Sequence, residues 1–282
     1  MQRQLDGKIV LITGSTDGVG RRVAVRLGQM GARVLVHGRD RARGEQVVAD
    51  IRANGNDHAA FYQADLASLA EVRRLAERVQ ADHGRLDVLI NNAGIGSAGP
   101  KGPRQESQDG HELRFAVNYL AGFLLTHLLL PTLRASAPAR IVNVASAGQH
   151  PIDFDDVMLT QNYSGGRAYT QSKLAQIMMT FDLARELDGT GVTVTCLHPA
   201  TYMDTTMVRQ AGTTPISTVE EGADAILNLA VSPALAGRTG LYFNGQREAR
   251  ADPQAYDADA RRKLRELSMR LTGLSEPSTA TP

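Results

Sequence analysis

Short runs of apolar and β-branched residues alternate with helical patterns along almost the whole chain. The runs are apolar at nearly every position, which is typical of strands covered on both faces of a sheet. Strict alternation of such strands with helices favours a parallel, doubly wound α/β sheet of about seven strands, with helices on both faces. The predicted strands are 9–13, 33–37, 59–63, 86–91, 139–146, 192–198 and 241–243, and the predicted helices are 19–30, 41–54, 68–83, 111–135, 167–187, 219–231 and 257–271.

Charge and cysteine content exclude several classes of protein. Lys and Arg total 31 against 30 Asp and Glu, and the basic residues are scattered, which argues against nucleic acid or an anionic membrane as the partner. Cys196 is the one cysteine and lies in an apolar run, so we expect a buried thiol, no disulfide and no metal site. The most apolar stretch, 120–133, is shorter than the roughly 20 residues of a membrane helix. We therefore expect a soluble, cytoplasmic protein.

A glycine-rich turn separates the first predicted strand from the first helix. Its glycines allow a tight turn and a close approach of a pyrophosphate, and the helix N-terminus behind it offers free N–H groups. We predict a dinucleotide site here and a single-domain Rossmann fold over residues 1–250, which includes the substrate pocket. Residues 251–282 would add a helix and a tail frayed over 275–282, not a second domain. The predicted cofactor-binding residues of the turn are Gly14, Ser15, Thr16, Asp17, Gly18, Val19 and Gly20.

The end of the second strand predicts which dinucleotide binds. An NAD site needs an acid here for the ribose hydroxyl, whereas this chain has His37 and Arg39. A guanidinium suits a 2′-phosphate, so we expect NADP(H) to be favoured over NAD(H). His37 would add to that preference when protonated at mildly acidic pH. The alternative for Arg39 is a solvated surface charge.

Two further strand ends carry candidate cofactor contacts. Asp65, followed by Leu66, could accept from the adenine amino group or could cap the next helix. Asn91 ends the fourth strand, where an amide can tie neighbouring strands together, and Ala93-Gly94 would let the cofactor pass closely. A plain turn is the alternative for this second segment.

Four polar residues at the same edge of the sheet suggest proton chemistry. Tyr169 and Lys173 are four residues apart and share a helix face, where a cation can lower the pKa of the phenol. Ser146 ends the fifth strand and can polarise a substrate oxygen. Asn118, amid apolar neighbours, either repairs a local backbone defect or holds a water. Individually, Tyr169 could be an amphipathic helix residue and Ser146 a turn residue.

In this order the motifs resemble the short-chain dehydrogenase/reductase family over residues 5–245. Tyr169 follows Ser146 by 23 positions, and together with Leu197-His-Pro199 this spacing resembles the retinol-dehydrogenase-like branch. The matching motifs are Thr13-Gly-x-x-x-Gly-x-Gly20, Asp65, Asn91-Asn-Ala-Gly94, Asn118, Ser146, Tyr169-x-x-x-Lys173 and Pro199. One departure is Ala200, where the family has glycine, so either Thr201 or Thr205 could touch the carboxamide beside Pro199.

The resemblance implies an oxidoreductase that transfers a hydride between NADP(H) and a carbonyl or secondary alcohol of an apolar small molecule. Tyr169 would exchange the proton, Lys173 would lower its pKa and bind the nicotinamide ribose, Ser146 would position the oxygen, and Asn118 would hold a relay water. A homodimer or homotetramer is also implied. The alternatives are a non-catalytic NADP-binding regulator, an NAD-dependent alcohol dehydrogenase of the same family, and an epimerase or dehydratase.

Overall fold

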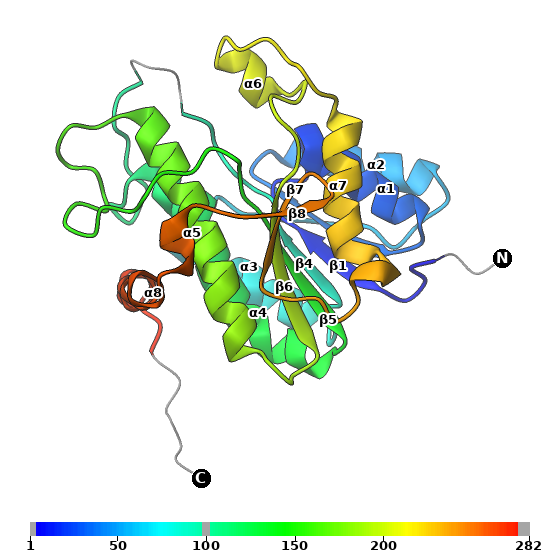
Figure 1. Ribbon diagram of the computed structural model, residues 1–282. Helices are drawn as coiled ribbons and strands as arrows, with labels where there is room; N and C mark the ends of the chain where they lie inside the picture. Colours follow the sequence, from blue (N-terminus) through cyan, green and yellow to red (C-terminus); the bar gives the residue numbers. More distant parts are fainter. Residues whose placement is uncertain (1–3, 98–101, 276–282) are drawn as a thin grey trace.

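The computed structural model describes residues 4–97 and 102–275, and it has the predicted α/β architecture (Figure 1). One sheet has the order β3-β2-β1-β4-β5-β6-β7-β8, and its strands up to β7 run parallel. The strands are β1 (Ile9–Ile12), β2 (Arg33–Gly38), β3 (Ala60–Gln63), β4 (Val88–Asn91), β5 (Ala139–Val144), β6 (Val192–His198), β7 (Leu241–Asn244) and β8 (Arg247–Ala249). The α-helices are α1 (Gly18–Gln29), α2 (Arg41–Ala53), α3 (Leu69–Asp82), α4 (Ala121–Ala135), α5 (Gly165–Glu186), α6 (Thr206–Gln210), α7 (Val219–Val231) and α8 (Ala258–Thr272).

The prediction of about seven strands misses β8. This strand pairs antiparallel with β7 across a turn at Gly245, whose φ of 58° suits glycine. Its residues Arg247 and Glu248 are exposed, so no apolar run announces it in the sequence. The five-residue helix α6 and the short 3₁₀ turns Pro233–Leu235 and Pro253–Tyr256 also lie outside the predicted elements.

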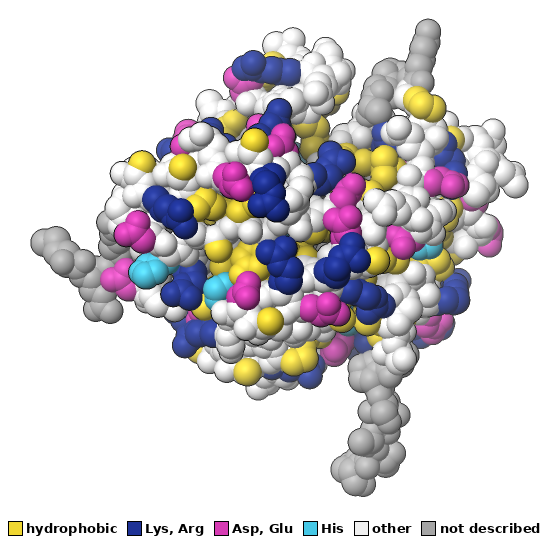
Figure 2. Space-filling view, turned by 180° about the vertical axis from the view of Figure 1, so that it is seen from behind, with side chains coloured by type: hydrophobic (Ala, Val, Ile, Leu, Met, Phe, Trp, Pro, Cys, Tyr) yellow, Lys and Arg dark blue, Asp and Glu magenta, His cyan; other side chains and the backbone are white. Residues whose placement is uncertain are grey.

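Helices cover both faces of the sheet and create two separate cores. On one face, α1, α2 and α7 pack over residues such as Val10, Val34 and Ile90. On the other face, α3, α4 and α5 pack over Leu11 and Leu89. Residues next to each other in a strand point to opposite faces. Because helices cover both faces, the central strands β1, β4, β5 and β6 are buried at nearly every position, which explains their continuous apolar runs. On the face shown in Figure 2, basic and acidic side chains are interspersed among the described residues.

The helix over the centre of the sheet begins with a π-helical turn, η1 (Phe115–Leu120), and continues as α4. Our prediction that this apolar stretch is too short to span a membrane is wrong, because the continuous helix Phe115–Ala135 has 21 residues and is long and apolar enough. About two-thirds of it is buried inside the protein, between the sheet, α3 and α5. That burial is typical of a core helix.

Helix α8 packs on the outer side of α5 (Figure 1) and contacts η1 through Ser268. Leu264 and Met269 are buried in the core shared with α4 and α5, and the Ser268 hydroxyl lies 2.7 Å from the Tyr119 hydroxyl. We expected an oligomer from the family resemblance, with the apolar helices 111–135 and 167–187 as the surfaces that could pair. Part of that surface, on α5 and η1, is covered within one chain by α8. The oligomeric state stays a prediction. Of the tail expected at 275–282, residues 276–282 lie outside the described residues.

Candidate active site

The carboxyl edge of the parallel sheet gathers the predicted site residues. Because all strands from β1 to β7 run in one direction, the segments that follow them emerge at one edge. These segments carry Gly14 after β1, Arg39 after β2, Asp65 after β3, Gly94 after β4, Ser146 after β5 and Pro199 after β6. Tyr169 and Lys173 reach the same edge from the first turns of α5.

The glycine-rich turn fits a pyrophosphate. Gly14 has a φ of 64°, and a Cβ there would lie 2.7 Å from the Ala93 Cα, so only glycine lets the β1 and β4 ends approach this closely. Asp17 caps α1 by accepting from the Gly18 N–H at 2.7 Å. Among the described residues, no group accepts from the backbone N–H groups of Val19 and Gly20. These unpartnered donors at a helix N-terminus are suited to phosphate oxygens.

His37 supports this turn from inside the protein. It is 2% exposed, and its Nδ1 accepts a hydrogen bond of 3.1 Å from the Gly14 N–H. Burial lowers the pKa of His37 from 6.5 to about 4. The imidazole is therefore neutral at mildly acidic pH, and our prediction that its charge strengthens phosphate binding there is wrong. Residues on both faces of β2 are buried, so the apolar pattern did not show on which side His37 lies.

The buried imidazole predicts an acid-sensitive fold. Because the unfolded chain takes up the His37 proton near pH 6.5 and the folded chain only near pH 4, stability falls as pH drops through this window. Within this window, the His37 proton changes the free energy of unfolding by about 1.4 kcal/mol per pH unit. Urea unfolding at several pH values should show a smaller slope for His37→Gln than for wild type. The exposed His150→Gln is the control, and equal slopes for wild type and His37→Gln would contradict this assignment.

The adenosine end of the site is open and basic. Arg39 is exposed, and among the described residues no carboxylate pairs with its guanidinium. Asp40 caps α2 by accepting from the Arg43 N–H at 3.1 Å, as its position one residue beyond Arg39 predicts. Arg39, a cation, is therefore the side chain at the β2 end that is available to bind a ligand.

Asp65 does not cap α3, which excludes our alternative for it. The cap of that helix is Ser68, whose Oγ accepts from the Glu71 N–H. One Asp65 oxygen accepts from the Ala67 N–H at 3.0 Å in a local turn. Leu66, its neighbour, is buried. Asp65 remains a candidate acceptor for the adenine amino group.

The two asparagines after β4 tie strand ends together. Asn91 Nδ2 donates to Asn143 Oδ1 on β5 at 2.8 Å and to Thr126 Oγ1 on α4 at 2.9 Å. Asn92 Nδ2 donates to the Thr13 and Gly14 carbonyls at the β1 end. The predicted strand-linking role of Asn91 is confirmed by these contacts, and the segment is more than a plain turn.

Ser146 and Tyr169 form the proton-handling part of the site. Burial raises the pKa of Tyr169, and a hydrogen bond with the Ser146 side chain offsets only part of that rise. The Lys173 Nζ lies 5.7 Å from the centre of the phenol ring. The net lowering of the Tyr169 pKa that we expected from Lys173 is therefore not present, because burial sets the direction of the shift and the group that opposes it is Ser146. The phenol is protonated at neutral pH and can donate to a substrate oxygen.

Lys173 is a buried cation with a donor to spare. Its Nζ donates to the Val144 carbonyl and to Gln176 Oε1, both at 2.9 Å, and burial lowers its pKa to about 7. An ammonium has three N–H groups, so one remains for a further acceptor. Gly94 faces it, since a Cβ there would lie 3.4 Å from Nζ. The residues here fit a ribose hydroxyl beside the β4 end.

Asn118 lies in the π-helical turn η1, the type of local helix defect that is frequent at functional sites. Its Oδ1 accepts from the Ile95 N–H at 2.8 Å, while Nδ2 donates to the Ile95 carbonyl and to Ser172 Oγ. These bonds use both amide hydrogens. The side chain therefore holds the loop after β4 in place. The water-holding role that we expected of Asn118 stays a prediction.

The segment between β6 and α7 separates the two threonines that we considered. Thr201 Oγ1 lies 3.0 Å from His198 Nε2, at the end of β6 beside the buried Pro199. Thr205 caps α6 and lies against the glycine-rich turn, since a Cβ on Gly18 would be 3.3 Å from its Cγ2. Met207 of α6 lies against Gly96 after β4, since a Cβ on Gly96 would be 3.1 Å from Met207 Cγ. The segment therefore reaches across the site from β6 to the β1 and β4 ends.

A comparison with protein-family models matches residues 8–215 to the short chain dehydrogenase family. This chain is a short-chain dehydrogenase. Human retinol dehydrogenase 13 is 38% identical over 97% of this chain and 87% of its own length. The retinol-dehydrogenase-like resemblance is thus confirmed. As a member of this family, the protein is an oxidoreductase that acts on CH–OH groups and binds a nicotinamide cofactor.

Solved structures agree with this family. An uncharacterized protein from Mycobacterium Paratuberculosis has a TM-score of 0.76 and 29% identity, and the match covers 98% of this chain and 97% of that one. A short chain dehydrogenase from Shigella flexneri 2a, solved with NADP, has a TM-score of 0.72 and 27% identity. That match covers 87% of this dehydrogenase and 100% of the Shigella chain.

Several residues of the dehydrogenase site were not predicted from the sequence. Gln176 holds Lys173, and its polar side chain on the buried face of α5, three residues after Lys173, was a usable signal. A buried ion pair joins Glu112 and Arg114 at 3.4 Å, just before η1. Arg114 Nε donates to the Gly96 carbonyl, and Glu112 Oε2 accepts from the Phe115 N–H at 2.8 Å. Charged residues near the start of a helix are usually exposed to solvent, so no sequence pattern indicated that Glu112 and Arg114 are buried.

Proposed function

We propose that this protein reduces a carbonyl group of an apolar small molecule, with NADPH as the preferred cofactor, and catalyses the reverse oxidation of the secondary alcohol. The observation that carries the proposal is the convergence of Ser146, Tyr169 and Lys173 at the β4 and β5 ends, beside an open glycine-rich turn.

Ser146, Tyr169 and Lys173 each have a separate role in the reduction. When bound, the nicotinamide supplies the hydride that forms the new C–H bond while the carbonyl π bond breaks. Ser146 donates to the substrate oxygen and polarises it. Tyr169, protonated because burial raises its pKa, gives its proton to that oxygen to form the O–H bond. Lys173 holds the ribose and, with a pKa of about 7, can return a proton to the phenolate near neutral pH.

The preference for NADP rests on Arg39. The β2 end carries this exposed guanidinium in the position where an NAD site needs an acid, and no carboxylate of the described residues pairs with it. The Shigella flexneri relative solved with NADP supports the same choice. Arg39→Ala should weaken NADPH binding about 10- to 150-fold, the range of a charge-assisted hydrogen bond, and should leave NADH binding nearly unchanged. Calorimetric titration gives the ratio of the two dissociation constants. An unchanged ratio, or a wild type that prefers NADH, would contradict the assignment.

An apolar substrate is supported by the segment that crosses the site. Met203, Met207, Val208 and Ile216 are its apolar residues, and methionine adapts to varied shapes. Met207 is 38% and Ile216 70% exposed, so both have apolar surface available to a ligand. Relatives named retinol dehydrogenases point to the same class of substrate.

A carbonyl panel tests the whole proposal. NADPH oxidation should be measured with apolar ketones and aldehydes, retinaldehyde included, beside small polar carbonyls, with NADH in parallel. We expect turnover with NADPH and apolar carbonyls. Faster turnover with NADH would favour an NAD-dependent alcohol dehydrogenase, while tight NADPH binding without turnover of any carbonyl would favour a non-catalytic regulator.

A further inference from the structure

Lys173 carries its charge inside the protein, and no carboxylate of the described residues pairs with it. It is 4% exposed, and its Nζ donates to two uncharged oxygens, the Val144 carbonyl and Gln176 Oε1, both at 2.9 Å. From the described part of the chain, two titratable side chains face it, Tyr169 on the same helix and His198 at the end of β6. Burial raises the pKa of Tyr169, and burial together with Lys173 lowers the pKa of His198, so both side chains are uncharged at neutral pH. Among these groups, the two oxygens therefore offset the cost of burying the ammonium.

Gln176 is built into the protein as firmly as the backbone oxygen beside it. It is 3% exposed, and because an ammonium can only donate, the amide oxygen is the atom that must face Lys173. The turn of α5 that carries Gln176 is fixed to the sheet, since its carbonyl accepts from Thr180 Oγ1 at 2.8 Å and Thr180 Oγ1 accepts from Asn143 Nδ2 of β5 at 2.9 Å. The same strand ends at Val144. Both acceptors of the ammonium are therefore held in fixed positions relative to β5.

This arrangement leaves the ammonium one N–H group for a further acceptor, the ribose in the proposed reaction. Without the Gln176 oxygen, the described residues would offer Nζ one acceptor, and its direction would be less fixed. The buried charge would also lose a stabilising hydrogen bond, so Lys173 would release its proton at lower pH. Either change would make Lys173 less able to return a proton to the Tyr169 phenolate.

We propose that Gln176 is a positioning residue, which directs the Lys173 ammonium toward the ribose and the phenol and stabilises its charge. The effect on turnover rests on the proposed function. The contact itself is present in the chain without cofactor, so it can be tested separately.

NMR of the full chain, labelled with carbon-13 at the lysine Cε, tests the contact without cofactor or turnover. The chain has four lysines, so the spectrum is simple, and the signal that is missing in Lys173→Met belongs to Lys173. In wild type this signal should titrate with a midpoint near pH 7. Gln176→Met, similar in size but without an acceptor, should lower the midpoint by about one to two pH units, the scale of a hydrogen bond to a charged group. Gln176→Glu keeps an acceptor and adds a negative charge, so it should raise the midpoint.

The pH profile of carbonyl reduction with NADPH is the second readout. Because Lys173 must be protonated to return a proton, kcat should fall at alkaline pH, and this limb should move to lower pH in Gln176→Met and to higher pH in Gln176→Glu. The KM for the carbonyl should change little, since Gln176 contacts Lys173 rather than the substrate. A merely structural role would lower kcat at all pH values without moving the limb.

The matched control is Gln171→Met. Gln171 lies on the same helix and is 1% exposed, but its Nε2 donates to the Val157 carbonyl at 2.8 Å, in the loop before α5. The Lys173 midpoint in this variant should equal that of wild type. The inference is overturned if Gln176→Met shifts the midpoint no more than Gln171→Met does, or if Gln176→Glu lowers it. If the midpoints move as expected but wild type reduces no carbonyl with NADPH, the proposed function fails while the contact stands, so the two failures are distinguishable.

Discussion

Tyr169→Phe should reduce carbonyl turnover by about 10² to 10⁴-fold, the usual contribution of a general acid, and should leave NADPH binding nearly intact. The substitution removes the transferable proton and keeps the ring that packs 5.7 Å from Lys173 Nζ. The loss should appear in kcat, because the proton moves only in the reaction step.

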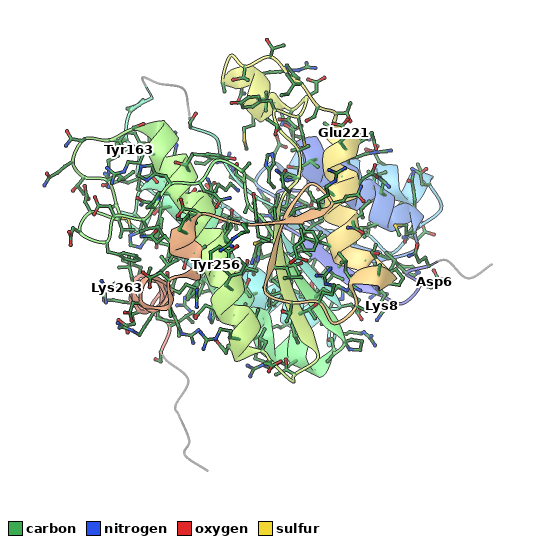
Figure 3. The ribbon with its side chains drawn as sticks, in the orientation of Figure 1. Asp6, Lys8, Tyr163, Glu221, Tyr256 and Lys263 are labelled. Carbon is green, nitrogen blue, oxygen red and sulfur yellow. The ribbon has the colours of Figure 1, made fainter. Side chains whose placement is uncertain are left out.

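Tyr256→Phe is the matched control for this experiment. Tyr256 lies in the turn before α8, against Phe181 of α5, so it tests the loss of a tyrosine hydroxyl away from the site (Figure 3). Its turnover should equal that of wild type. If Tyr169→Phe keeps more than about a tenth of wild-type kcat, Tyr169 is not the general acid.

Glu112→Ala should lower the free energy of unfolding by about 3–5 kcal/mol, because it leaves the Arg114 charge buried without its partner. The two side chains are 1% and 2% exposed. The same carboxylate accepts from the Phe115 N–H at the start of η1 and from the hydroxyl of Tyr163, in the loop before α5. Its loss therefore loosens three segments around the site at once.

Urea unfolding measures this change, with Glu106→Ala as the control. Glu106 belongs to the same loop and pairs with Arg104, but its side chain is 52% exposed, so its removal should cost no more than about 1 kcal/mol. A Glu112→Ala variant as stable as Glu106→Ala would show that the buried pair does not stabilise the loops.

The strands of the sheet and most residues of the site can be predicted from the sequence, because both depend on local patterns. Runs that are apolar at every position predict the buried strands. The glycines at 14, 18 and 20 lie where the backbone leaves little room for a side chain. The Tyr169–Lys173 spacing needs only helical geometry. For these features, each residue's role follows from its neighbours in the chain.

Features that depend on distant partners were not predictable in this way. The side of β2 on which His37 lies, the net pKa of Tyr169 and the clamp between Asn118 and Ile95 all result from packing of segments remote in sequence. The apolar surface of α5 looked like an interface because the sequence does not show that α8 returns to pack on it. Strand β8 forms only because β7 offers it an edge.

Direct hydride transfer is the central claim of this account, and a labelled cofactor tests it. NADPH carrying deuterium at the transferable C4 position of the nicotinamide should be incubated with wild-type protein and an apolar ketone that it reduces. Mass spectrometry of the alcohol should show one deuterium on the former carbonyl carbon, and Tyr169→Phe should give almost no labelled alcohol. Alcohol formed without the label, or equal labelled product from Tyr169→Phe, would contradict the assignment of this site.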